Sequence, residues 1–558
     1  MAAVPARQGP GSIPARNARA PGPAPSPLAG SSRGAAPSTS GQPAAPRPGF
    51  RTASPHHKQT PARVPVPLNA APAAAVPATT PPVPVVARVL AVCSGESSAL
   101  GPDWATVFRH IADRIGWADA RIRVSVLTLD DLAERAGEAA RRAEEADVLL
   151  CVGVDGASVS SPGAATLLRA CDGTGAPSAL GAALSRIPTR ACIASSPAVG
   201  RAVDRLGGYS GAEGPLSGRE RGLASLPAPL GNPWRARVLG EETLAAVRAL
   251  AARENSDDLM FLTLVLVDAF VAPVPLLPKK GMGPGGILRM LRYCTKEVVA
   301  CLTDPTCKRA LEELEKVGLN DQVGSYRVIV SFETRLFQEF ALCVVQKHNC
   351  MDQVAEVPTT PDPAPLATYR GRPMTHELAE EILMGSLADS GGDLPWSWKV
   401  TAGQNAAYDQ FPCQFQLYYR GRARNSLWYD PTFKVTTLDG EQVWCRRHYR
   451  VRRGEAPGVF WYSVLDNGVI STEHWKVLDA DDEGTFLVCY YQGAAKAAGL
   501  SYTGSVICTK DGVWPTDPEK LARIERALGR AGIKMWELCF VDHTQSAEGA
   551  PIDVREGV

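Results

Sequence analysis

The feature that most constrains the fold is a series of short β-type segments, separated by tight turns, that begins at residue 396. Asp-Gly and Asn-Gly pairs at 439–440, 467–468 and 511–512 are strong two-residue hairpin signals. The segments are "WSWKVTA", "CQFQLYY", "SLWYDPTFKVTTL", "QVWCRRHYRVRR", "GVFWYSVL", "VISTEHWKVLD", "TFLVCYYQG" and "SYTGSVICT". Eight antiparallel strands can close into a barrel just wide enough for one small ligand, so we expect a β-barrel over 396–513.

A single amphipathic helix is expected directly after the last strand. In "TDPEKLARIERALGRAGI" (516–533), Thr516 with Glu519 three residues later has the pattern of a capping box. Eight antiparallel strands followed by one helix is the plan of a lipocalin. We therefore assign 514–545 to a C-terminal helix and 546–558 to a tail.

The first 84 residues are basic and rich in Pro, Ala, Ser and Gly. They contain no Asp or Glu and show no hydrophobic period, which predicts disorder. Two interpretations stay open: a disordered basic tail, or an organelle transit peptide followed by a linker. The formal net charge of the whole chain is +1, so its overall charge predicts no nucleic-acid partner.

Residues 85–280 alternate strand-like and helix-like segments, which is typical of parallel strands joined by crossover helices. Apolar runs at 85–95, 121–129 and 147–154 are the expected strands. No dinucleotide-binding or phosphate-binding glycine motif follows them. We expect a Rossmann-like α/β domain of unassigned role, with the apolar stretch 259–278 buried in its core because an Asp and three prolines interrupt it.

Residues 281–355 are predicted to be helical and cysteine-containing, and 356–395 to be a linker. The chain has 14 cysteines, no C-x-x-C and eight scattered histidines, so no metal site is predicted. Cys294 and Cys301 have the same spacing as Cys343 and Cys350. These four are disulfide candidates as two local pairs in an oxidising compartment, and the alternative is a set of reduced buried thiols.

Several motifs resemble the violaxanthin de-epoxidase family of plastids. They are "CTKEVVACLTDPTC" (294–307), "CVVQKHNC" (343–350), "YDQFPCQF" (408–415) and "EHWKVLDADDEGTFLVCYYQG" (473–493). "LWYDPTFKVTTLDGEQVWCRRHYRVRRGEAPGVF" places the chain nearest the related-protein branch of that family. The resemblance covers about 285–545 and implies a lipocalin barrel that opens xanthophyll epoxides with ascorbate as reductant.

The resemblance also implies site residues. A carboxylic acid with a raised pKa, inside an apolar barrel, is the expected proton donor to the epoxide oxygen. Asp409 and Glu473 match the positions of family acids and are the predicted catalytic residues. The expected substrate contacts are Tyr491, Trp475, Trp398 and Tyr502.

Some family positions differ. Pro412 and His474 stand where the family has acids, and Cys508 stands where it has a Tyr. The family bridge from the cysteine matched by Cys413 cannot form, because Gln545 occupies the partner position.

Two functions are consistent with these residues. One is a de-epoxidase-type oxidoreductase of the xanthophyll cycle, located in the chloroplast and expected in the thylakoid lumen. The other is a non-catalytic lipocalin that binds a carotenoid or another apolar ligand. The expected partners are this ligand, the thylakoid lipid surface and a second copy of the chain as a homodimer; the expected cofactor is ascorbate, with no metal.

Overall fold

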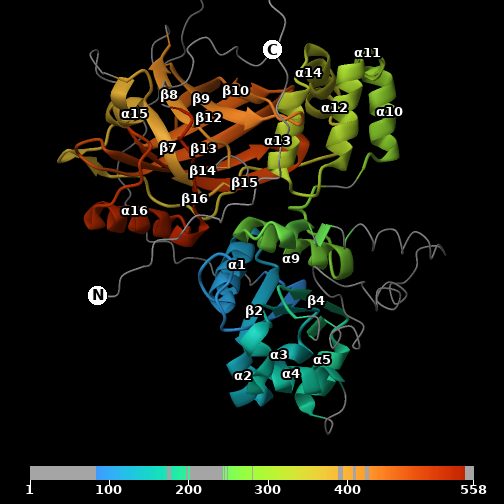
Figure 1. Ribbon diagram of the computed structural model, residues 1–558. Coiled ribbons are helices and arrows are strands. Elements are labelled where there is room, and N and C mark those ends of the chain that lie inside the picture. Colours follow the sequence, from blue (N-terminus) through green and yellow to red (C-terminus); the bar gives the residue numbers. More distant parts are fainter. Residues whose placement is uncertain are drawn as a thin grey trace, which may run out of the picture. The chain divides into compact units, whose positions relative to one another are not determined.

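The computed structural model contains a parallel sheet, a large antiparallel sheet and a small two-stranded sheet (Figure 1). It describes residues 83–172, 178–196, 199–200, 243, 246–247, 249–278, 281–387, 394–405, 410–421 and 426–546. These residues belong to one compact unit, Thr80–Val558. The predicted transit peptide, the tail beyond 546 and the candidate acid Asp409 lie outside the described residues.

The first sheet has four parallel strands in the order β2-β1-β3-β4. They are β1 (Ala87–Cys93), β2 (Ile122–Thr128), β3 (Val148–Val152) and β4 (Thr189–Ile193). The helices around it are α1 (Trp104–Ala118), α2 (Leu129–Glu134), α3 (Ala136–Glu144), α4 (Pro162–Asp172), α5 (Ala179–Arg186) and α9 (Ser256–Phe270). The predicted α/β domain is confirmed, and the apolar stretch at 259–278 contributes buried residues of α9 to its core.

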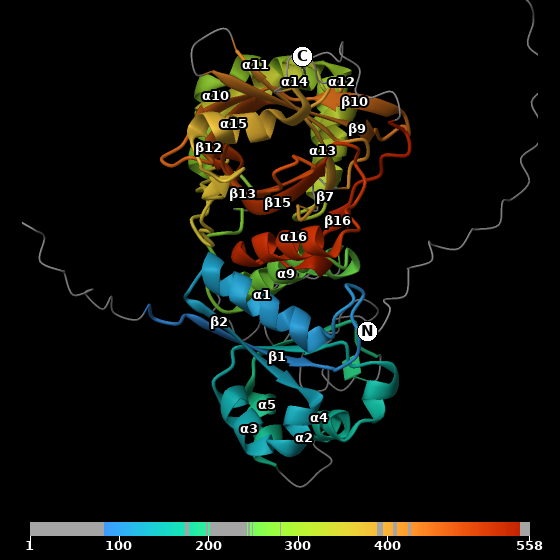
Figure 2. The ribbon, with the colours of Figure 1, turned by 90° about the vertical axis from the view of Figure 1, so that its left-hand side faces the viewer.

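The second sheet closes into an eight-stranded antiparallel barrel, as predicted. Its strands are β7 (Trp398–Gly403), β8 (Phe415–Arg420), β9 (Leu427–Thr436), β10 (Gln442–Arg446) with β11 (Tyr449–Arg453), β12 (Val459–Asp466), β13 (Val469–Ala480), β14 (Phe486–Ala495) and β15 (Leu500–Thr509). The ring closes because β7 pairs with both β8 and β15. Figure 2 looks into this ring of strands.

One predicted strand is divided in two. The segment "QVWCRRHYRVRR" forms β10 and β11, which pair with successive parts of β9 in the same register. The interruption lies opposite Pro431, which has no N–H to give to a neighbouring strand. Across the gap, the Arg447 N–H donates to the Pro431 carbonyl at 3.1 Å.

The barrel is covered by helices on several sides. On its outside, α16 (Pro518–Arg530) packs Ile524, Ala527 and Leu528 against outward-facing residues of β13 and β14 (Figure 2). Its N-cap is Asp517, whose carboxylate accepts from the Glu519 N–H at 2.8 Å, so the predicted cap at Thr516 is wrong by one residue. After it come the short turn η5 (Met535–Glu537) and β16 (Cys539–Phe540), which pairs with β7.

Residues 356–395 are not a simple linker, contrary to the prediction. They form the short hairpin β5 (Thr368–Tyr369) and β6 (Arg372–Pro373) and the helix α15 (His376–Met384). Leu378, Ile382 and Leu383 of α15 are buried in the barrel core. Thr375 caps the helix by accepting from the Leu378 N–H, a signal that was present in the sequence.

The cysteine-containing region forms a group of short helices beside the barrel (Figure 1). They are α10 (Pro284–Tyr293), α11 (Thr295–Thr303), α12 (Pro305–Lys316), α13 (Gln322–Ser331), α14 (Arg335–Ala341) and the π-helical turn η2 (Leu342–Lys347). Among the described residues, no helix combines the length and the apolar character that a membrane crossing requires.

Candidate functional site

Strand register brings four of the predicted site residues to one region of the barrel interior. Along β13, Glu473 lies opposite Gly493 of β14, and Trp475 lies opposite Tyr491. Gly493 in turn pairs with Tyr502 of β15. Because successive side chains on a strand point to opposite faces, these residues share the inner face of the sheet.

Glu473 is the acid of this region. Its side chain is buried, with a residue exposure of 5%. One carboxylate oxygen accepts from the Trp475 indole N–H at 2.6 Å, and the other accepts from the Tyr502 hydroxyl at 2.8 Å. Burial raises the pKa of Glu473 by more than these two donors lower it.

A stack of aromatic rings surrounds the acid on its apolar side. The Trp475 indole lies flat between Tyr462 and Tyr491, with ring centroids 4.7 Å away on each side. Tyr502 meets the Tyr491 ring edge to face. The rings give the cavity beside the carboxyl an apolar aromatic wall.

Two glycines make room for the tyrosines. A Cβ at Gly504 would come within 2.4 Å of the Tyr491 ring, and a Cβ at Gly493 would come equally close to the Tyr502 ring. Each tyrosine pairs with the glycine of the neighbouring strand, and its ring folds across that glycine. Glycine at these two positions therefore fixes where both tyrosine rings lie.

The inner face encloses a cavity of about 300 Å³. Glu473, Trp475, Tyr491 and Tyr502 all line it. Ser325, Tyr326 and Ile329 of α13 also line the cavity, so the helical region contributes to the site. A second cavity of about 1130 Å³ adjoins the first, and the two share Asn320, Gln322, Asn405 and Tyr502.

Of the other two predicted site residues, one lies away from the cavity and the other is outside the described residues. Trp398 does not line the cavity, because its indole N–H donates to the Ile382 and Leu383 carbonyls of α15 at 3.0 and 3.1 Å. The structure does not describe Asp409, although Asn405 and Phe411 on either side of it line the cavity.

Two neighbours of the site point outward. Tyr490 packs against the α16 side of the sheet, so Tyr491 is the inward member of the pair. His474 faces away from the interior and contacts Glu455, with Nε2 3.2 Å from Oε1. The inward position of Tyr491 and the outward position of His474 both follow from strand alternation.

The cysteine pairing differs from the prediction. Cys294 is bonded to Cys343 and Cys301 to Cys307, while Cys350 is a free, buried thiol. Residues seven apart along a helix rise about 10 Å, whereas bridged cysteines have Cα atoms within about 7 Å, so α11 keeps Cys294 and Cys301 apart. The chain folds back between α11 and α12, which brings Cys301 and Cys307 to a Cα separation of 5.1 Å.

Cys413 at the head of β8 is also a free thiol. It is fully buried, and its pKa is raised by burial and lowered by hydrogen bonds from the Ser546 side chain and the Gln545 backbone. Its N–H donates to the Asp542 carbonyl at 2.8 Å. The C-terminal segment therefore reaches the position expected of the family's bridging partner, without a bridge.

Sequence reasoning missed several contributors to the site, among them Ser471, Tyr462 and Gly504. Ser471 and Glu473 have the same parity on β13, and the Ser471 Oγ lies 2.7 Å from the Tyr502 hydroxyl. Strand alternation could have identified Ser471 once Glu473 was chosen. The stacking of Tyr462 on Trp475 depends on pairing between β12 and β13, which no single segment reveals.

The part of the chain that holds this site is similar to known proteins. Residues 287–543 match the family model described as the VDE lipocalin domain. The chain is 23% identical to the chloroplastic violaxanthin de-epoxidases of Nicotiana tabacum (233 residues; 40% of this chain and 44% of that protein) and Arabidopsis thaliana (249 residues; 43% and 49%). It thus spans less than half the length of these curated relatives.

Two of the solved structures with some similarity come from a lobster and from a moth, the tobacco hornworm. Lobster apocrustacyanin A1 is 11% identical, with a TM-score of 0.20, over 26% of this chain and 76% of that chain. Insecticyanin from the tobacco hornworm Manduca sexta is 11% identical, with a TM-score of 0.20, over 26% and 77%. The barrel of this chain is defined by the pairing of its own strands and not by these similarities.

Proposed function

We propose that this chain, whose residues 287–543 carry a VDE lipocalin domain, is a plastid oxidoreductase that reductively opens xanthophyll epoxides. The observation that carries the proposal is Glu473, a buried acid with a raised pKa that faces an apolar cavity. Epoxide opening needs a proton delivered to the oxygen as its C–O bonds break. A protonated carboxyl sheltered from water is suited to that step.

The full reaction converts an epoxide to an alkene and water, and it consumes two electrons and two protons. Ascorbate, the reductant implied by the resemblance, supplies two electrons and two protons on becoming dehydroascorbate. Glu473 delivers the proton to the epoxide oxygen. The stacked rings of Tyr462, Trp475 and Tyr491 hold the ring end of the substrate against this carboxyl.

Tyr502 and Ser471 form a path that can return a proton to Glu473. The Tyr502 hydroxyl lies 2.8 Å from the Glu473 carboxylate and 2.7 Å from the Ser471 hydroxyl. When Glu473 is ionised, Tyr502 donates to it; when Glu473 is protonated, the tyrosine can turn its hydrogen to Ser471 and accept from the acid. The same hydroxyl thus serves both protonation states.

The cavity volume determines how much of the substrate enters. About 300 Å³ is at the lower end of small-molecule sites, which suits a ring and not a whole xanthophyll. We propose that the polyene passes Tyr502 and occupies the second cavity, which begins at the residues shared by both. Asp409 stays a candidate second acid, on the resemblance and on the position of its neighbours Asn405 and Phe411.

A lipid surface is part of the same proposal. Ile287, Leu288 and Leu291 of α10 and Val299 and Leu302 of α11 are all at least 44% exposed. Arg292 and Lys296 lie among them in sequence, together with one acid, Glu297. Exposed apolar side chains flanked by basic ones are typical of a surface that lies in the headgroup region of an anionic membrane, where xanthophylls dissolve.

The second candidate function is a lipocalin that binds an apolar ligand without turnover. The replacements Pro412 and Cys508 favour it, because an acid and a hydroxyl of the family are absent there. A homodimer is a further prediction for either function.

One experiment separates the two functions. The purified full chain is incubated with violaxanthin and ascorbate at about pH 5, and the pigments are separated by chromatography. We expect loss of epoxide, reduced by about 100-fold or more in Glu473→Gln, the usual contribution of a general acid. Glu455→Gln, which removes an exposed carboxylate, is the matched control. Pigment that copurifies unchanged in wild type and in Glu473→Gln would establish the binding function instead.

A further inference from the structure

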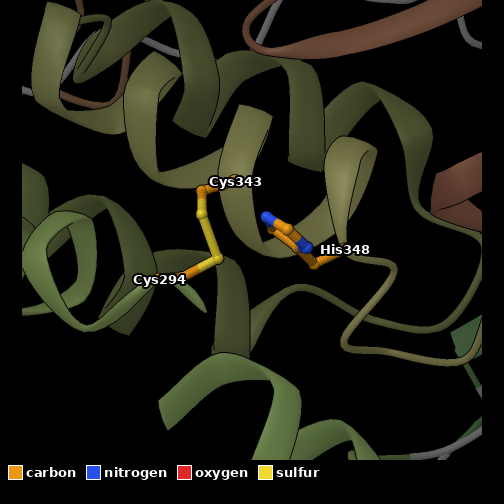
Figure 3. Close-up of side chains that lie close together, drawn as sticks. All are labelled: Cys294, Cys343 and His348. Atoms are coloured by element: carbon orange, nitrogen blue, oxygen red, sulfur yellow. A yellow bond between two sulfur atoms is a disulfide. The ribbon is translucent and has the colours of Figure 1, made fainter. Parts of the chain in front are cut away.

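Three side chains with metal-binding atoms meet in the helical region, away from the barrel cavity. They are Cys294 at the junction of α10 and α11, Cys343 in η2, and His348 just after η2. Their Sγ and ring nitrogen atoms all lie within 4.8 Å of one another. Figure 3 shows the His348 imidazole beside the Cys294–Cys343 disulfide.

The imidazole is held in place by its surroundings. Its ring stacks on Tyr293, with centroids 4.7 Å apart and planes 4° from parallel. Arg289 donates to the His348 carbonyl at 3.1 Å and to the Asn349 carbonyl at 2.9 Å, and it forms an ion pair with Asp352. The loop that carries His348 is thus anchored to α10 independently of the disulfide.

We propose that the reduced form of this disulfide, together with His348, is a binding site for Zn²⁺. A dithiol or phosphine reductant breaks the S–S bond by supplying two electrons, and two protons complete the thiols. Zn²⁺ then displaces both thiol protons and bonds to the two thiolates and the imidazole. Water fills the fourth tetrahedral position.

The geometry fits this exchange. Zn–S bonds of about 2.3 Å and Zn–N bonds of about 2.0–2.1 Å place tetrahedral ligand atoms roughly 3.5–3.8 Å apart. The sulfurs need only separate from bonded contact, and the imidazole nitrogen, within 4.8 Å of both sulfurs, needs only a small shift. Cys294 and Cys343 are 49 residues apart in sequence, so the site does not have the short spacing between ligands by which zinc motifs are identified in a sequence.

The second disulfide is a built-in comparison. Cys301 and Cys307 also become thiols on reduction, yet they belong to none of the metal-type clusters among the described residues. The proposed site therefore joins the α10–α11 junction to η2 under reducing conditions, where the disulfide would be lost. The helix group keeps this link in either redox state.

The test uses the full chain, reduced with a phosphine, freed of reductant without oxygen, and titrated with Co²⁺ as a spectroscopic substitute for Zn²⁺. We expect one equivalent to bind with thiolate-to-cobalt charge-transfer and tetrahedral d–d bands, and none to bind the oxidised protein. The Cys301→Ser/Cys307→Ser variant keeps this signal. His348→Ala weakens binding by more than the roughly 10–100-fold typical of a lost outer partner.

Several results would overturn the proposal. They are no stoichiometric binding after reduction, cobalt bands that persist in Cys294→Ser/Cys343→Ser, or an affinity that His348→Ala leaves unchanged. His376→Ala, in α15, is the matched histidine control. Circular dichroism of each reduced variant verifies that it is folded, so that loss of binding reports on the ligands.

Discussion

The hydroxyl of Tyr502 controls the proton affinity of Glu473. Its hydrogen bond lowers the pKa of the acid, against burial, which raises it. Tyr502→Phe removes the donor, so the pKa of Glu473 rises further. A hydrogen bond to a charged group contributes about 1.5–3 kcal/mol, which corresponds to a shift of about one pH unit or more.

The higher pKa of Glu473 in Tyr502→Phe can be detected without enzyme activity, from the pH dependence of the free energy of unfolding. An acid with a folded-state pKa above its unfolded value favours the fold at low pH, and that contribution is lost as pH rises through the folded pKa. We expect Tyr502→Phe to move this loss to higher pH in denaturant unfolding curves, and to move the upper limit of any de-epoxidation activity the same way. Tyr490→Phe, on the outer face, should leave both midpoints in place. Identical pH profiles for Tyr502→Phe and wild type would refute the coupling.

The close packing at Gly493 of β14 and Gly504 of β15 leads to a prediction about the stability of the barrel. Gly504→Ala would drive a methyl group into the Tyr491 ring, and the ring cannot move away without leaving its stack on Trp475. Overpacking of this kind costs about 1–3 kcal/mol of the free energy of unfolding. Gly529→Ala in α16, with no atom within 4 Å of the added Cβ, should instead stabilise by about 0.5–1 kcal/mol. Equal effects at both positions, measured by chemical denaturation, would contradict the steric argument.

The exposed face of α10 and α11 leads to a prediction about membranes. Leu288→Glu/Leu291→Glu replaces two of its most exposed apolar side chains, each of which contributes roughly 1.5–3 kcal/mol when buried. We expect partitioning to vesicles that contain anionic lipid to fall by about tenfold or more in a sedimentation assay. Leu465→Glu alters a similarly exposed leucine at the end of β12 and should not change it. Full binding by the double variant would exclude this face as the contact.

Local patterns in the sequence were sufficient to predict most helices and strands, but not all of the contacts between them. Alternation and Asn-Gly or Asp-Gly turns predicted the barrel strands. Glu473, Trp475 and Tyr491 were chosen from the family resemblance, and the pairing of β13 with β14 brings them together. Helix α15 was not predicted, because the prolines and acids around it indicated a linker. The cysteine pairs were misassigned because equal spacing in sequence does not reveal that α11 is straight between Cys294 and Cys301.

In the whole molecule, the C-terminal segment is held against the first barrel strands without a disulfide. Cys413, at the head of β8, accepts hydrogen bonds from the Ser546 side chain and from the backbone of Gln545, the residue that the resemblance matches to the bridging cysteine. Ser546→Cys should therefore restore a bridge in oxidising buffer. A bridge that closes so long a loop stabilises by about 2–4 kcal/mol, chiefly by restricting the unfolded chain.

The bridge would be detected as a loss of two thiols in native mass spectrometry and as a higher denaturant midpoint that reverts on reduction. Thr544→Cys, close by but without a contact to Cys413 in the described structure, is the matched control. If Ser546→Cys leaves both thiols free, Cys413 does not face the C-terminal segment in solution. The C-terminal segment would then be attached to the barrel at this edge by other contacts, such as the pairing of β16 with β7.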